Sequence, residues 1–234
     1  MPDMKLKHSA RTHPPAAPST LPPLNAATLL RALFKRPRRA SGLPTPRTRN
    51  LLRAHAAPDP GAPLLLTTSV TIQPPTEHCA VLALLETAGE LHGQALFDCH
   101  STYLMVRGRA RPGSGRAPEA PLPALDGWEV GRSCGRRYAA LSGDWNPIHL
   151  WPWSARLMGM GQPIIHGMHS LARACAALER VHGRPVTLLD ARFRAPVPLA
   201  SELALGADAD AAGGMFTVAR DGRIAVSGHY ALAI

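Results

Sequence analysis

The sequence predicts an α+β protein in which one long helix packs against a curled antiparallel sheet. Residues 164–181 form the strongest helical pattern of the 234-residue chain, and Gly183 and Pro185 follow as a C-terminal stop. Short apolar and β-branched runs come after it, separated by turn residues, as is typical of antiparallel strands. Weaker runs of the same kind precede residue 107. The pattern therefore occurs twice, weakly in the first half and clearly in the second.

The first half is expected to contain one helix and several strands. Residues 1–23 are rich in proline and predict no regular element, whereas residues 24–34 carry leucines at helical spacing and predict a short helix that ends at Pro37. Three apolar runs bounded by Pro, Gly or His then predict strands at 64–72, 80–86 and 94–106.

A linker separates the two halves. Eighteen of the 24 prolines lie before residue 124, and residues 107–123 are a mixture of Pro, Gly, Ala and Arg that cannot hold a regular element. We therefore divide the chain into residues 1–106, a linker 107–123 and a second unit 124–234. That unit begins with residues 128–140 and a turn-rich excursion. After its helix come four expected strands, the last two joined by an Asp-Gly hairpin turn, at 186–195, 201–209, 215–220 and 224–233.

The positive charge is concentrated at one end of the chain. Of the formal net charge of +10, residues 1–60 contribute eleven Lys and Arg against two acidic residues, whereas residues 61–234 are almost neutral with fifteen against fourteen. A basic segment attracts polyanions such as the phosphates of coenzyme A, an acidic carrier protein or nucleic acid, or is simply a solvated arm. Nucleic acid is disfavoured, because no aromatic residues interleave these charges and no known binding module surrounds them.

The remaining composition predicts a cytoplasmic protein. The sequence has no apolar run long enough to span a membrane and no apolar secretory signal at its N-terminus. The four cysteines are far apart and form no Cys-x-x-Cys pair, so we expect reduced, structural thiols and neither a disulfide framework nor a zinc site.

The segment Ser142-Gly-Asp-Trp-Asn-Pro-Ile-His149 carries an acid and a base on one turn. Pro147 fixes its own backbone and keeps Asn146 out of the helical region, so Asp144 and His149 are held irregularly and can converge on one small molecule such as water. Taken singly, Asp144 could be a turn carboxylate and His149 a packing histidine. Their joint occurrence upstream of a glycine-initiated helix favours an active site.

Gly167 opens the long helix, where unpaired N–H groups and the helix dipole favour negative charge. An oxyanion developing on a thioester would be stabilised there, although close packing of the helix start would also explain a glycine. His166 and His169 flank it, but without a third ligand at suitable spacing they predict packing or orienting roles and no metal site.

At these residues the chain resembles the MaoC-like (R)-specific enoyl-CoA hydratase family. The resemblance covers roughly residues 128–234 and rests on Tyr138-x-x-x-Ser142-Gly143-Asp144-x-Asn146-Pro147-Ile-His149, on Pro163-Ile-Ile-His166-Gly167-Met168 and on Phe193-Arg-Ala-Pro196-Val197. It implies a hot-dog fold and an acyl thioester of coenzyme A or a carrier protein as substrate. It assigns Asp144, His149 and the N–H of Gly167 to catalysis, and Ser142, Gly143, Asn146 and His166 to substrate binding or orientation.

One residue departs from the family pattern. Many members have an aspartate two residues after the histidine, where this chain has Trp151; we expect Ser154 to supply the helix cap instead. The first half lacks the motif, which predicts a degenerate hot-dog repeat that accommodates the acyl chain.

The expected reaction is reversible hydration of a trans-2-enoyl thioester to the (R)-3-hydroxyacyl thioester, with no metal or redox cofactor. A hot-dog thioesterase and a non-catalytic acyl-thioester binding protein are the alternatives. The sequence leaves acyl length open, and likewise the choice between a monomer and a homodimer.

Overall fold

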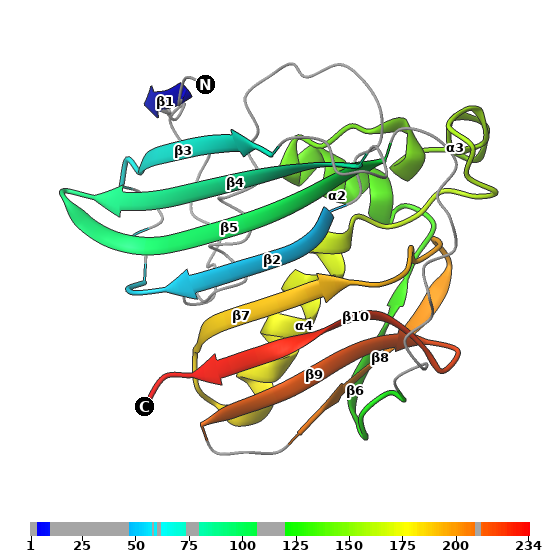
Figure 1. Cartoon of the computed structure of the whole chain (residues 1–234). Coiled ribbons are helices and arrows are strands. Elements are labelled where there is room, and N and C mark those ends of the chain that lie inside the picture. Colours follow the sequence, from blue (N-terminus) through cyan, green and yellow to red (C-terminus); the bar gives the residue numbers. More distant parts are fainter. Residues whose placement is uncertain are drawn as a thin grey trace, which may run out of the picture.

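A computed structural model describes residues 4–9, 47–57, 59, 62–73, 80–106, 120–208 and 212–234. Its strands form one ten-stranded antiparallel sheet in the order β1-β3-β4-β5-β2-β7-β10-β9-β8-β6 (Figure 1). The strands of the first half are β1 (Met4–Ser9), β2 (Arg47–Ala54), β3 (Leu65–Ile72), β4 (Ala80–Leu91) and β5 (Gln94–Val106). Those of the second half are β6 (Ala124–Val130), β7 (Val186–Phe193), β8 (Ser201–Ala207), β9 (Gly213–Arg220) and β10 (Arg223–Leu232).

The helices described all belong to the second half. They are α2 (Cys134–Ser142), the 3-10 helix η1 (Pro147–His149), α3 (Pro152–Leu157) and the long helix α4 (Gly167–His182). Helix α4 lies against the strands of the second half (Figure 1), which confirms the expected arrangement of a helix against an antiparallel sheet. It begins three residues later than the apolar pattern indicated, because Ile164 forms a bridge to Pro198 and Ile165 donates to the carbonyl of Val197.

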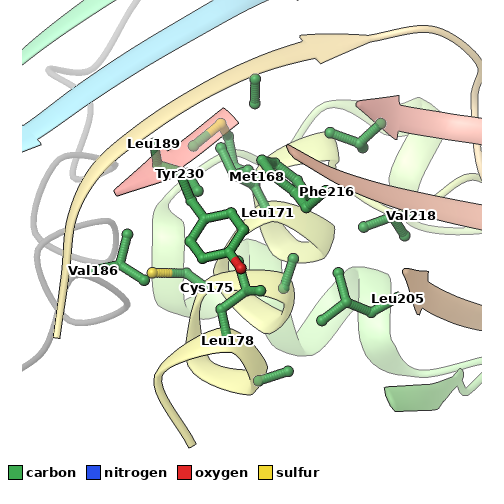
Figure 2. Close-up of a cluster of buried hydrophobic side chains, with 14 of the residues drawn as sticks. Met168, Leu171, Cys175, Leu178, Val186, Leu189, Leu205, Phe216, Val218 and Tyr230 are labelled. Carbon is green, nitrogen blue, oxygen red and sulfur yellow. The ribbon is translucent and has the colours of Figure 1, made fainter. Parts of the chain in front are cut away.

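Apolar side chains of α4 recur at three- and four-residue spacing and face the sheet. Figure 2 shows this cluster, in which residues from one side of the helix meet inward-facing residues of the strands. The helix contributes Met168, Leu171, Cys175 and Leu178, and the strands contribute Val186, Leu189, Leu205, Phe216, Val218 and Tyr230; all are buried. The same core continues into the first half through Leu52, Leu96 and Phe97.

Strand β2 joins the two halves by pairing with β5 on one side and β7 on the other. Residues 47–54 were expected to be part of the basic arm, and this expectation was wrong. Asn50 and Leu52 are buried while Arg49 and Arg53 are exposed, so the period-two pattern of a strand lies within an arginine-rich segment. Arg49 also binds both carboxylate oxygens of Asp190 on β7, at 2.8 and 2.6 Å. The expectation of no regular element in residues 1–23 was also wrong, because β1 (Met4–Ser9) pairs with β3.

Most other expected strands are present with small shifts of their ends. Strand β5 has the expected bounds, whereas β4 runs on to Leu91, where His92 and Gly93 make a two-residue hairpin turn with φ of 50° and 80°. The expected helix at 24–34, Cys79 and most of the predicted linker lie outside the described residues. No helix in the part of the chain that the structure describes has the length and apolar character needed to cross a membrane.

Candidate active site

The turn that carries Asp144 begins where α2 ends. Gly143 has a φ of 74° and donates its N–H to the carbonyl of Ala139 at 2.8 Å, which is the usual way for glycine to end a helix. Ser142 donates its hydroxyl to the Tyr138 carbonyl at 2.8 Å and accepts the N–H of Asp144 at 3.2 Å. Ser142 and Gly143 therefore shape the exit from the helix and fix the start of the turn.

Side-chain oxygens then hold the turn from within. An Asp144 carboxylate oxygen accepts the N–H of Asn146 at 3.4 Å, and Asn146 Oδ1 accepts the N–H of Ile148 at 3.3 Å. The second bond caps η1, which has Pro147 in its first turn. Asn146 thus fixes the start of η1, and the irregular turn expected from Asp-Trp-Asn-Pro is present.

His149 is held in one tautomer. Its Nδ1–H donates to the Ile164 carbonyl at 2.8 Å, so in the neutral ring Nε2 carries the free lone pair. The residue is only 7% exposed. Burial lowers the pKa of His149, while the hydrogen bond to Ile164 and the negative charge of Asp144 partly oppose that effect. His149 is therefore a neutral imidazole at physiological pH and can accept a proton.

His166 supports both members of the pair. Its Nε2–H donates to the backbone carbonyl of Asp144 at 2.9 Å, and its ring stacks on that of His149 with centroids 3.6 Å apart. Burial, followed by repulsion from His149, lowers the pKa of His166 to about 4, so it too is neutral. Tyr138 packs against this ring at 4.9 Å and against the ring of His169 at 5.5 Å.

Gly167 is the first residue of α4, directly after His166. Its N–H belongs to the first turn, whose N–H groups have no acceptor within the helix. A Cβ at this position would lie 2.7 Å from Cε1 of Phe193, well inside contact distance. The two explanations offered for this glycine are therefore compatible, since the bare backbone fits under an aromatic ring and also leaves the helix start uncovered.

Ser154 takes the capping role expected of it. Its hydroxyl accepts the N–H of Trp151 at 3.3 Å and donates to the Pro147 carbonyl at 2.7 Å. The side chain therefore ties the start of α3 to η1 even though no carboxylate stands at position 151.

Asp144, His149 and His166 come together with one potential ligand atom each, all within 4.8 Å of one another. The turn thus supplies the additional potential ligands, Asp144 and His149, that the spacing of His166 and His169 in the sequence did not reveal. His169 lies outside this group, against Tyr138. The two imidazole rings are inclined by only 27°. The two rings therefore lie in nearly parallel planes with their centroids 3.6 Å apart, and a single ion at bonding distance could not lie in the plane of both. The arrangement suits proton transfer between a carboxylate and an imidazole.

Two hydrogen-bond acceptors at this site were not predicted from the sequence. The carbonyl of Ile164 orients His149, and the carbonyl of Asp144 is held by His166. Both partners are backbone groups, which residue type cannot reveal. The spacing of His149 and His166 around a turn and a helix start was the available signal that the two segments meet.

Comparison with known proteins assigns the part of the chain that carries these residues to a domain family. Residues 115–224 match the MaoC like domain. Over 80 residues the chain is 36% identical to 3-hydroxyacyl-thioester dehydratase X of Mycobacterium tuberculosis, a match that covers 34% of this chain and 28% of that protein. The chain thus aligns with less than a third of this curated relative.

Solved structures show the same fold. A MaoC-like dehydratase from Phytophthora capsici superposes with a TM-score of 0.72 at 20% identity, covering 89% of this chain and 83% of that one. A Mycobacterium tuberculosis protein with a double hotdog fold superposes with a TM-score of 0.53 at 17% identity, covering 80% and 74%. The chain therefore contains a MaoC-like domain in residues 115–224 and, as a whole, has the double hot-dog fold of these solved structures.

Proposed function

We propose that the protein catalyses the reversible hydration of trans-2-enoyl thioesters to (R)-3-hydroxyacyl thioesters. The observation that carries this proposal is the convergence of the Asp144 carboxylate with a buried, neutral His149 whose Nδ1 is already occupied. An oriented acid–base pair of this kind can bind one water molecule between its two members. The family match and the curated relative, whose name describes a 3-hydroxyacyl-thioester dehydratase, support the same chemistry.

The reaction follows from the state of each group. Asp144 and His149 Nε2 hold a water molecule, whose oxygen bonds to C3 of the enoyl thioester as one of its protons passes to the pair. The electrons of the C2–C3 double bond move toward the thioester carbonyl, and the N–H of Gly167 stabilises the enolate oxygen. The pair then returns the proton to C2. One water has been added, the enzyme is unchanged, and the reverse sequence is the dehydration.

Product analysis with trans-2-enoyl-CoA tests the proposal. Loss of the conjugated enoyl absorbance, together with formation of the 3-hydroxyacyl thioester, is the expected result, and chiral chromatography of that product is expected to give the (R) form. Release of free thiol without a hydrated product would identify a thioesterase instead. Saturable binding of the thioester without any conversion would identify a non-catalytic binding protein. Either outcome would overturn the proposed hydration.

A further inference from the structure

A second concave surface lies beside the proposed site. It is a groove of about 1020 Å³ bordered by α2, α3, the segment before α4 and the turn between β9 and β10. Four of its lining residues are arginines, namely Arg132, Arg136, Arg156 and Arg220. The volume is that of a site for a small organic molecule.

Three of the four arginines keep their positive charge available. Arg220 is paired with Asp221 at 2.9 Å, and Glu202 is the other acidic residue of the lining. Within the described part of the chain, no carboxylate forms an ion pair with Arg132, Arg136 or Arg156. The groove therefore has an excess of two positive charges and three guanidinium groups that can donate to an anion.

Arg136 is partly fixed in place. It donates to the Leu150 carbonyl at 3.2 Å and lies over the ring of Trp151, with 5.9 Å between its guanidinium carbon and the ring centroid. Only part of its donor set is used by these contacts, since a guanidinium has five N–H groups. A side chain held in this way loses less conformational entropy when it binds an anion.

The groove and the proposed site use neighbouring residues of the chain. Leu150 and Pro163 line the groove, and they are the chain neighbours of His149 and Ile164. The two stretches are joined by the hydrogen bond from the Ile164 N–H to the Ile148 carbonyl at 3.0 Å, and the Ile164 carbonyl accepts the hydrogen bond of His149. The groove and the Asp144–His149 pair are thus built from adjoining residues of the same two stretches.

We propose that this groove binds the phosphate groups of the coenzyme portion of the substrate, while the acyl thioester lies at Asp144 and His149. The inference rests on the proposed function. Arginine forks match phosphate oxygens in geometry and charge, and several arginines in a single groove favour a ligand with more than one phosphate. The phosphorylated adenosine diphosphate of coenzyme A has this character, whereas the arm of a carrier protein contributes a single phosphodiester.

A series of shortened substrates tests the assignment. Crotonyl-CoA, crotonyl-phosphopantetheine and crotonyl-pantetheine offer the same reacting group with three phosphates, one phosphate and none. The triple variant Arg132→Gln, Arg136→Gln, Arg156→Gln is expected to raise KM for crotonyl-CoA about tenfold, to raise it less for the phosphopantetheine thioester, and to leave the pantetheine thioester unchanged. Equal effects on all three substrates, or none on crotonyl-CoA, would overturn the proposal.

Arg137 provides a matched control, since it is an exposed arginine of α2 that does not line the groove. Arg137→Gln is expected to leave KM for all three substrates unchanged. The double variant Arg132→Gln, Arg156→Gln, which keeps the contact of Arg136 with Leu150, guards against a folding defect and is expected to show a smaller effect in the same direction.

A binding measurement tests the groove assignment independently of the hydration reaction. Calorimetric titration with adenosine 3′,5′-bisphosphate, which has no acyl group, is expected to show one site that weakens as salt rises and is lost in the triple variant. Bisphosphate binding without hydration of any enoyl thioester would contradict the proposed function and leave the groove assignment standing. Hydration without bisphosphate binding would refute the groove assignment alone.

Discussion

Replacing Gly167 by alanine separates the two explanations for this glycine. The new Cβ would lie 2.7 Å from Cε1 and 2.8 Å from Cδ1 of Phe193, so the ring has to move by about an ångström to reach ordinary contact distance. Overpacking costs about 1–3 kcal/mol, and the low end applies because Phe193 is only half-buried. The higher helix propensity of alanine returns up to about 1 kcal/mol. The free energy of unfolding should therefore change by no more than about 1 kcal/mol.

Activity is expected to respond far more than stability. If the N–H of Gly167 donates to the enolate oxygen, a methyl group beside it keeps the thioester away and should lower kcat for hydration roughly a hundredfold. Urea unfolding and steady-state hydration of crotonyl-CoA measure the two effects. In the double variant Gly167→Ala, Phe193→Leu, the smaller side chain at position 193 leaves room for the new methyl group. This variant is expected to recover stability but not kcat. Near-normal kcat in Gly167→Ala would refute the oxyanion role.

The remaining predictions concern the acid–base pair, the buried imidazoles and the junction. Asp144→Asn and His149→Ala should each lower the hydration rate on the order of a hundredfold or more at unchanged circular dichroism, and two nearly active variants would exclude the shared water. Because burial lowers the pKa of His149, kcat/KM should be retained on acidification through pH 6.5 and fall only below it; a fall centred above pH 6.5 would contradict this. The folded protein holds His166 at a pKa of about 4 against the ordinary 6.5, so the unfolded chain binds more protons between these values. Stability, measured by urea unfolding, should thus be full above pH 6.5 and fall by up to roughly 3 kcal/mol toward pH 4, and a flat profile would rule out a buried neutral ring. Leu52→Ala should lower the free energy of unfolding by about 2–5 kcal/mol, whereas Arg49→Ala at the exposed ion pair should cost less than about 1 kcal/mol; comparable losses in thermal or urea unfolding would contradict the burial of β2.

The parts of the fold that could be predicted have one clear periodicity. Helix α4 combines a buried stripe with Gly183 as a C-terminal stop, and β5 is a long run bounded by turn residues. Strand β2 was missed because its outward positions are arginines, which drew attention to net charge and concealed the alternation of Asn50 and Leu52. The pairing of β2 with β7 spans more than a hundred residues of sequence and leaves no local trace.

The candidate site likewise has parts that the sequence could predict and parts that it could not. Asp144, His149 and Gly167 could be selected as candidates from residue type and spacing, the first two for their side chains and the glycine for its place at the helix start. The geometry that makes them usable depends on the carbonyls of Ile164 and Asp144, which every residue possesses. The stacking of two neutral histidines could not be predicted either, because it requires the turn and the helix start to be folded against each other.

Because β2 pairs with β7, the sheet contact at this edge of the second half does not depend on protein concentration. The free edge of β7 would otherwise expose unpaired N–H and C=O groups, which is where another chain adds to a sheet. Here a strand of the same polypeptide takes that edge, so the contact is intramolecular and dilution cannot separate its partners. A second copy could pair there only by displacing β2. In the described sheet β1 and β6 are the strands left at the edges, so any assembly by sheet extension would have to use those.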